Sequence, residues 1–272
     1  VSVSYPVTMI YMAVALGINI GCSVVISQLF GAKRMERMKT AVSTSLISTA
    51  ALALLLTVLG LIFCNPLLRL LNTPDNIMDP TSQYLRIYTC GLLFIFIYNT
   101  CTGIFTALGD TMTPLIFLVV SSLSNIGLDI VSVVSTDMGV AGLALATLIC
   151  QAIAAIVSFL VLLGRLKRIP SGKWEYFSRP LLQTISTLAI PGILQKSFVS
   201  VGNLLVQGLV NSYEATVPGI IGGFSSATKL IYLVVYVNSA MGSAVASFTA
   251  QNIGANKFVR LSRGLRSGIL IC

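Results

Sequence analysis

Two polar side chains, Asn125 and Asp129, stand four residues apart inside a long apolar stretch of this sequence. Residues at this spacing share one face of a helix, so an amide oxygen and a carboxylate would point the same way. A carboxylate inside a membrane span costs at least ~2.5–3.5 kcal/mol on insertion scales. Asp129 is the only acidic residue well inside an apolar run. It predicts a proton or cation site, with a structural carboxylate held by a hydroxyl or a helix end as the alternative.

A hydroxyl on the next apolar run, that of Thr147, is expected at a similar depth in the membrane. Carboxylate, amide and hydroxyl oxygens suit hard cations, so Asp129 is the expected Na⁺ ligand if the coupling ion is sodium. The sequence has no His, which removes imidazole proton relays and Ser-His catalysis. It also has no nucleotide-binding motif. We therefore expect no cofactor, and an ion gradient of Na⁺ or H⁺ as the energy source.

The elements that carry these residues are predicted to be transmembrane helices. Of the 272 residues, 56% are hydrophobic and 9% are charged, whereas soluble domains average about 25% charged. Each full apolar run is long enough to cross a hydrocarbon core of ~30 Å. The runs lie at residues 5–30, 41–63, 84–108, 114–134, 140–163, 182–210 and 220–250, and an eighth begins near Leu261. The fold class is thus an all-α polytopic membrane bundle with seven complete spans and a stub.

The net charge of +9 suggests nucleic-acid binding at first, but the placement of the charges argues for membrane topology instead. Lys and Arg concentrate in the breaks at residues 31–40, 165–179 and 254–266, and the breaks at 65–83, 135–139 and 211–219 are not basic. Basic loops stay on the cytoplasmic side. We therefore expect a multi-pass protein of the cell membrane, with the lipid bilayer and no nucleic acid among its partners.

Residues 28–33 (QLFGAK) recur as residues 251–256 (QNIGAN) at an offset of 223 residues, which also pairs Arg37 with Arg260. Both copies end an apolar run and open a basic break, in the same orientation, as in parallel transporter repeats. A repeat of this length implies a chain of roughly 450 residues, from which this piece would lack the first span and most of the last four. We expect an N-terminal lobe at 1–164, a cytoplasmic inter-lobe loop at 165–180 and the start of a C-terminal lobe at 181–272.

Several strings resemble the multidrug and toxic compound extrusion (MATE) family, in its prokaryotic DinF-like type. They are LGDTxTP at 108–114, NxxxD at 125–129, MGVAGxxLAT at 138–147 and LAIP at 188–191. The resemblance implies that Asp129, Asn125, Asn99 and Thr147 bind the coupling cation, with a partner Asp on a helix before Val1. It implies secondary active multidrug efflux, in which Na⁺ or H⁺ exchanges for an organic cation by alternating access.

Other polar and aromatic side chains are candidates for lining a substrate cavity. Lys196, beside Gln195, lies inside the run at 182–210, where it either snorkels to the interface or lines a cavity. Tyr98 and Tyr236 either line a cavity for small amphiphilic or cationic substrates, or pack in the core or against lipid. We expect a monomer.

Three alternatives to multidrug efflux remain open. A lipid-linked oligosaccharide flippase of the same superfamily would carry more cationic side chains in its central cavity. A membrane-embedded enzyme is disfavoured, because a single intramembrane acid and no His leave acid–base or metal chemistry without partners. A non-transporting membrane scaffold would have no use for a buried carboxylate.

Overall fold

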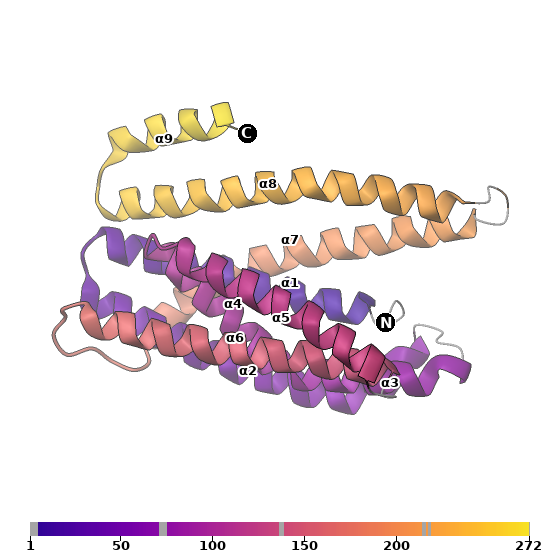
Figure 1. Cartoon of the computed structure of the whole chain (residues 1–272). Helices are drawn as coiled ribbons and strands as arrows, with labels where there is room; N and C mark the ends of the chain where they lie inside the picture. Colours follow the sequence, from indigo (N-terminus) through magenta and orange to yellow (C-terminus); the bar gives the residue numbers. More distant parts are fainter. Residues whose placement is uncertain (1–4, 71–74, 136–138, 214–215, 217–218, 272) are drawn as a thin grey trace.

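A computed structural model of the chain describes residues 5–70, 75–135, 139–213, 216 and 219–271. These residues are helical and contain no strand, as the sequence predicts. Figure 1 shows the helices lying along one common direction. They are α1 (Tyr5–Gly31), α2 (Met35–Leu70), α3 (Asp75–Cys90), α4 (Leu92–Ala107), α5 (Met112–Ser135), α6 (Gly139–Arg168), α7 (Arg179–Ser212), α8 (Ile220–Gly254) and α9 (Phe258–Ile271).

Six of these helices, α1, α2, α5, α6, α7 and α8, are long and apolar enough to cross a membrane. Helices α3 and α4 pass the same test together, as one span bent by 45°. The structure thus has six candidate spans, or seven if α3 and α4 are counted as one, at the positions of the seven predicted spans, and α9 corresponds to the predicted start of an eighth. Large apolar side chains such as Leu54, Ile116 and Leu160 lie exposed on the outer faces of these helices, as expected for surfaces that meet lipid.

The bend in the third span was not foreseen, because an unbroken apolar run covers residues 84–108. The bend lies at Gly91, between α3 and α4. A Cβ at this position would lie 3.1 Å from the carbonyl oxygen of Tyr88, closer than most Cβ contacts. The absence of a side chain at Gly91 thus accommodates the turn, which sets the direction in which α4 carries Tyr98 and Asn99.

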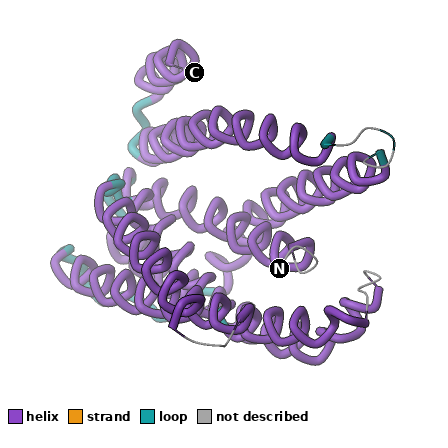
Figure 2. The backbone as a smooth tube through the Cα atoms, turned by 45° about the vertical axis from the view of Figure 1, so that its right-hand side comes forward, coloured by secondary structure: helices purple, strands orange, loops and turns teal. Residues whose placement is uncertain are grey.

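Helix α1 lies at the centre of the bundle, in contact with α2, α4, α7 and α8 (Figure 2). Gly17 and Gly21 let it approach α7 closely, since a Cβ on either would overlap the α7 backbone at Ile193 or Ile185. Small residues permit such close packing of membrane helices. Helix α8 contacts α1 near its C-terminal end, where Ala250 is buried, and Figure 2 shows its N-terminal half apart from α2–α6.

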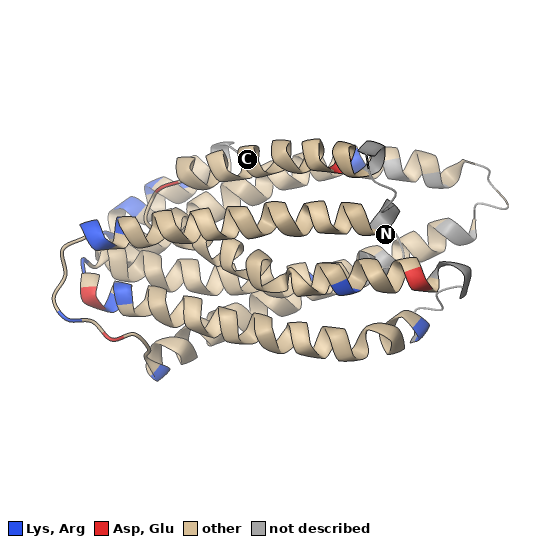
Figure 3. Cartoon of the chain, turned by 60° about the horizontal axis from the view of Figure 1, so that its bottom comes forward, with Lys and Arg blue, Asp and Glu red and all other residues tan. Residues whose placement is uncertain are grey.

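The turns at residues 32–34, 169–178 and 255–257 lie at one end of the bundle, on the left of Figure 1. Figure 3 shows that most Lys and Arg side chains gather there. We call this end the basic end, and the positive-inside rule predicts that it is cytoplasmic. Residues 136–138 and 214–215 of the predicted opposite breaks, which include Asp137 and Glu214, lie outside the described residues.

The turn between α4 and α5, also at the basic end, is held by Asp110. Its carboxylate accepts hydrogen bonds from the backbone N–H (3.0 Å) and hydroxyl (2.6 Å) of Thr113 and forms an ion pair with Arg165 of α6. Gly109 before it has a left-handed φ of 84°. The string at 108–114 therefore has a structural use, since it starts α5 and ties that start to the end of α6.

The two copies of the repeated hexapeptide touch each other at the basic end. A Cβ on Gly31 of α1 would overlap the backbone carbonyl of Gln251 of α8, and a Cβ on Gly254 would overlap that of Gln28. Each glycine thus packs against the glutamine of the other copy. The contact between α1 and α8 is reciprocal, as expected for two equivalent segments related by a repeat.

The turns that follow the two glycines also match. Lys33 and Asn256, which the repeat pairs, both have a left-handed backbone conformation, with φ of 57° and 55°. Positive φ is uncommon for residues other than glycine, so its occurrence at paired positions supports the repeat. The Gln251 amide in addition donates to the carbonyl of Ala107 at the end of α4 (2.8 Å), which joins a third helix to this contact.

Candidate cation site

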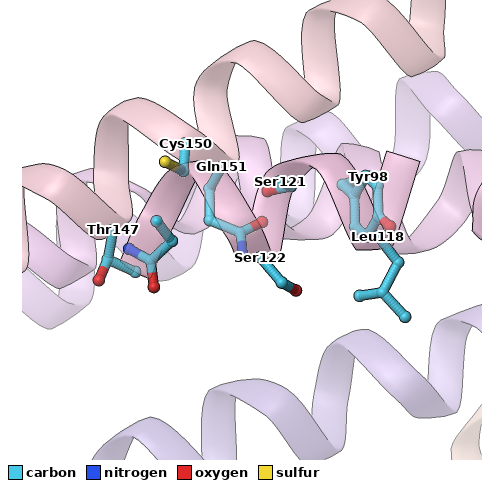
Figure 4. Close-up of a pocket in the computed structure, with 8 residues that line it drawn as sticks. Tyr98, Leu118, Ser121, Ser122, Thr147, Cys150 and Gln151 are labelled. Atoms are coloured by element: carbon cyan, nitrogen blue, oxygen red, sulfur yellow. The ribbon is translucent and has the colours of Figure 1, made fainter. Parts of the chain in front are cut away.

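A polar cavity of about 90 Å³ lies between α4, α5 and α6, and it contains two of the four predicted site residues. Figure 4 shows side chains from the three helices converging on it. Asn125 of α5 and Thr147 of α6 lie on its wall. The full lining comprises Tyr98, Leu118, Ser121, Ser122, Asn125, Thr147, Cys150 and Gln151.

Asn125 and Asp129 both carry a buried polar atom without a hydrogen-bond partner among the described residues. These atoms are Nδ2 of Asn125 and Oδ1 of Asp129. An unsatisfied buried polar atom costs about 1–3 kcal/mol, and more when it is charged. The carboxylate oxygen of Asp129 can hold a proton or a cation, whereas Nδ2 of Asn125 is a donor and can bind only an acceptor such as water.

Asp129 lies one turn beyond Asn125 on α5, outside the cavity lining itself. Its carboxylate is close enough to the hydroxyl of Tyr84 and the thiol of Cys150 to interact with both electrostatically. Helices α3, α5 and α6 therefore all contribute groups around this carboxylate.

The hydroxyl of Thr147 donates a hydrogen bond to the carbonyl of Leu143 in its own helix (3.0 Å). Since the hydroxyl proton is used in this way, the lone pairs of its oxygen remain free to face a cation. Ser121 and Ser122 add further hydroxyls to the cavity, and Gln151 adds an amide. Sequence reasoning missed these three, although Ser121 and Ser122 lie one turn before Asn125 on α5.

Asn99 of α4 does not line this cavity. Its side-chain amide donates a hydrogen bond to the backbone carbonyl of Ile95, one turn earlier (2.8 Å). Its backbone carbonyl accepts a hydrogen bond from the side-chain amide of Asn19 of α1 (2.7 Å). The structure thus places Asn99 at a polar contact between α1 and α4, while its neighbour Tyr98 reaches the cavity. Asn19 was not singled out from the sequence, because its partner lies 80 residues away along the chain.

The other candidate residues lie on α7 and α8, away from this cavity. Lys196 is partly buried on α7 and Gln195 beside it is exposed. Tyr236 of α8 is 69% exposed and lies 5.9 Å from the ring of Tyr232. None of the three is among the side chains that line the cavity between α4, α5 and α6.

The donor set around Asn125 and Asp129 consists of carboxylate, amide and hydroxyl oxygens. Within the described residues, no group of three or more His, Cys, Asp or Glu side chains gathers to hold a metal ion. Hard monovalent cations and protons match oxygen donors of this kind, whereas transition metals favour nitrogen and sulfur ligands.

Comparisons with known proteins point in one direction. A family model described as MatE matches residues 1–131. The chain is 31% identical to "Probable multidrug resistance protein YoeA" of Bacillus subtilis, over 99% of this chain and 59% of that protein. It is 22% identical to "FAD transporter" of Shewanella oneidensis, over 97% of this chain and 59% of that protein. The chain thus spans less than two thirds of the length of these relatives.

Solved structures agree with the sequence comparisons. One is described as "Outward-facing conformation of a multidrug resistance MATE family transporter of the MOP superfamily". It superposes with a TM-score of 0.88 at 25% identity and covers 100% of this chain and 60% of that one. The helical arrangement described above is therefore that of a MATE transporter.

Proposed function

This chain belongs to the MATE family, whose members are multi-pass membrane transporters rather than enzymes, and we propose that it performs secondary active multidrug efflux by cation antiport. In this proposal Na⁺ or H⁺ enters at Asp129 while an amphiphilic organic cation leaves. The observation that supports the proposal is the buried Oδ1 of Asp129, which has no hydrogen-bond partner among the described residues and lies one turn from Asn125 in the wall of a polar cavity.

The coupling follows from the position of the carboxylate among three helices. When neither a proton nor a cation is bound, the Asp129 carboxylate is a negative charge between α3, α5 and α6. A bound proton or cation neutralises that charge. The loaded and empty forms therefore favour different helix packings, which is what a ligand needs in order to shift a two-state equilibrium. Asn125 and Thr147 supply oxygen atoms for the cation, and Ser121 and Ser122 supply hydroxyls for substrate or water in the cavity.

The arrangement of the helices supports an alternating-access mechanism, in which it would be one of the two states. Helices α1 and α8 meet at the basic end through Gly31 and Gly254, and α8 separates from α2–α6 toward the opposite end. With the basic end in the cytoplasm, this is an outward-facing state. The 1–164 and 181–272 segments would act as the two lobes, and the loop at 169–178 would connect them.

One observation favours a second substrate class. Lys196 is a partly buried cation on α7, and one relative is described as a transporter of FAD, an anionic molecule. An organic anion held by Lys196 is therefore the alternative cargo. Addition of FAD to the assay of fluorescent-cation efflux separates the two. If an organic anion is the cargo, FAD should inhibit that efflux, and if an organic cation is the cargo, FAD should leave it unchanged.

The test uses the full-length protein in proteoliposomes that contain a fluorescent organic cation, with an imposed Na⁺ or H⁺ gradient. Asp129→Asn removes the charge with little change in volume, so the protein should fold and insert while efflux falls to background. Asp79→Asn is the matched control, because Asp79 is an exposed acid on α3. Efflux at the wild-type rate in Asp129→Asn would refute the assignment.

A further inference from the structure

A second cavity, unrelated to the ion site, lies at the basic end between the start of α2, the connecting loop and the start of α7. Its volume is about 440 Å³, within the ~300–1,000 Å³ typical of small-ligand pockets. Four charged side chains line it, two of each sign: Glu36 and Arg37 from α2, and Lys173 and Glu175 from the loop. Trp174 and Leu181 supply apolar surface.

The shape of this cavity is fixed by hydrogen bonds that tie the loop to α2. The hydroxyl of Thr44 accepts the Ser178 N–H (3.1 Å), and the hydroxyl of Thr40 accepts the Glu175 N–H (3.2 Å). Ser43 donates to the Tyr176 carbonyl (2.6 Å). Near the start of the loop, the buried Lys39 ammonium donates to the carbonyl of Ile169 (2.7 Å). These hydrogen bonds fix the loop against α2, so the wall of the cavity has a defined position.

The four charges in the wall are available to a ligand. None of them forms an ion pair, since the ion pair found among the described residues is Arg165–Asp110. All four side chains belong to exposed residues. The Glu36 carboxylate lies against Gly172 of the loop. Two cations and two carboxylates around one cavity favour a zwitterion over a purely anionic or cationic ligand.

The location points to lipid. The cavity lies at the basic end, where α7 begins and where the membrane surface is expected. Exposed aromatic residues lie on the same loop: Trp174 lines the cavity, its ring lies 5.0 Å from that of Tyr176, and Phe177 follows them. Tyr176 is 74% exposed. Aromatic residues of this kind concentrate at the depth of lipid headgroups.

We propose that this cavity binds the headgroup of a zwitterionic phospholipid that carries a primary ammonium, the phosphatidylethanolamine class. The phosphate lies between Arg37 and Lys173, the ammonium lies between Glu36 and Glu175, and the glycerol end leaves past Trp174. Because the cavity joins α2 to α7, a bound lipid bridges the two segments that are proposed to move during transport. The binding itself does not depend on the ion site.

Trp174 is the one tryptophan of these 272 residues and lies in the cavity wall, so the fluorescence that is lost in Trp174→Phe reports on this cavity. The experiment places the full-length protein in phosphatidylcholine vesicles that contain increasing fractions of brominated phosphatidylethanolamine, brominated phosphatidylcholine or brominated phosphatidylglycerol, each lipid in a separate series. Bromine quenches tryptophan at short range, and the signal of Trp174→Phe is subtracted. We expect half-quenching at about fivefold less phosphatidylethanolamine than phosphatidylcholine, the effect of one or two exposed ion pairs.

Variants assign the effect to the cavity. Arg37→Gln and Glu175→Gln should each reduce the preference for phosphatidylethanolamine, since each removes one half of the zwitterion site. Arg34→Gln is the matched control, because Arg34 lies at the basic end just before α2 but not in the cavity wall. This variant should keep the preference for phosphatidylethanolamine. Equal quenching by the three lipids in the wild type, or stronger quenching by phosphatidylglycerol, would overturn the proposal. A failure of ion-coupled efflux leaves this measurement unaffected.

Discussion

Adding a single methyl group at Gly31 should weaken the closure of the basic end. Real Cβ atoms do not approach another heavy atom within 3.0 Å, and a Cβ at Gly31 would lie closer than that to the carbonyl oxygen of Gln251. The obstacle is backbone, so it cannot move aside as a flexible side chain could. Overpacking of this kind costs about 1–3 kcal/mol. If α1 and α8 separate in the other transport state, the cost falls on the closed state alone. The closed population should then drop about 5- to 150-fold relative to the open one.

The assay is a distance measurement by pulsed electron spin resonance between labels at two exposed positions of the basic end, Lys167 in the last turn of α6 and Lys257 after α8. Gly31→Ala should shift the distribution toward longer distances. Gly254→Ala should produce the same shift, because the contact is reciprocal. Gly164→Ala on α6 is the matched control, since a Cβ there meets nothing within 4 Å. An unchanged distribution in Gly31→Ala, or an equal shift in Gly164→Ala, would show that the glycine contact does not close this end.

Three further predictions concern single contacts. Partial desolvation acts to raise the pKa of Asp110, but the hydrogen bonds from Thr113 and the charge of Arg165 hold that pKa below its usual 3.8. The stabilisation by Asp110 is therefore present above pH 3.8 and lost as the pH falls through the lowered pKa, so the melting temperatures of wild type and Asp110→Asn should converge only below that pH. Gly103→Ala should destabilise the protein by about 1–3 kcal/mol in unfolding experiments, because its Cβ would lie 2.7 Å from Oδ1 of Asn19; adding Asn19→Ala should recover part of that loss, and strict additivity would contradict the clash. Thr147→Ala and Asn125→Ala should each raise the ion concentration needed for half-maximal efflux while leaving drug binding intact, and unchanged ion dependence would remove them from the site.

Much of the fold could be predicted because membrane spans are recognisable in the sequence as long apolar runs. Unbroken apolar runs and basic breaks located the six long apolar helices, the bent pair α3–α4 and the basic end. The bend at Gly91 escaped, since a glycine in an apolar run is also compatible with straight helix. The repeat predicted that Gly31 and Gly254 are equivalent, but not that the two copies touch, because contact depends on how α1 and α8 are brought together.

The candidate site shows the same division. The spacing of Asn125 and Asp129 on one helix placed them on one face, and the resemblance added Thr147, which the structure brings to the same cavity. Asn99 was named by the same resemblance, yet its side chain bonds within its own helix. The partners that depend on tertiary packing, such as Asn19 and Tyr84, carry no local signal in the sequence. Hydrogen bonds and charges between distant helices become visible only once the helices are placed.

The central claim is that Asp129 binds the coupling cation, and charge displacement on a solid-supported membrane tests it most directly. Vesicles that contain the full-length protein receive a rapid jump in Na⁺ concentration and, separately, in pH, with no drug present. A cation that enters the site moves charge and gives a transient current. We predict a saturable current from at least one of the two jumps in the wild type and in Asp79→Asn, and none from either jump in Asp129→Asn. A current of wild-type size in well-folded Asp129→Asn would contradict the account.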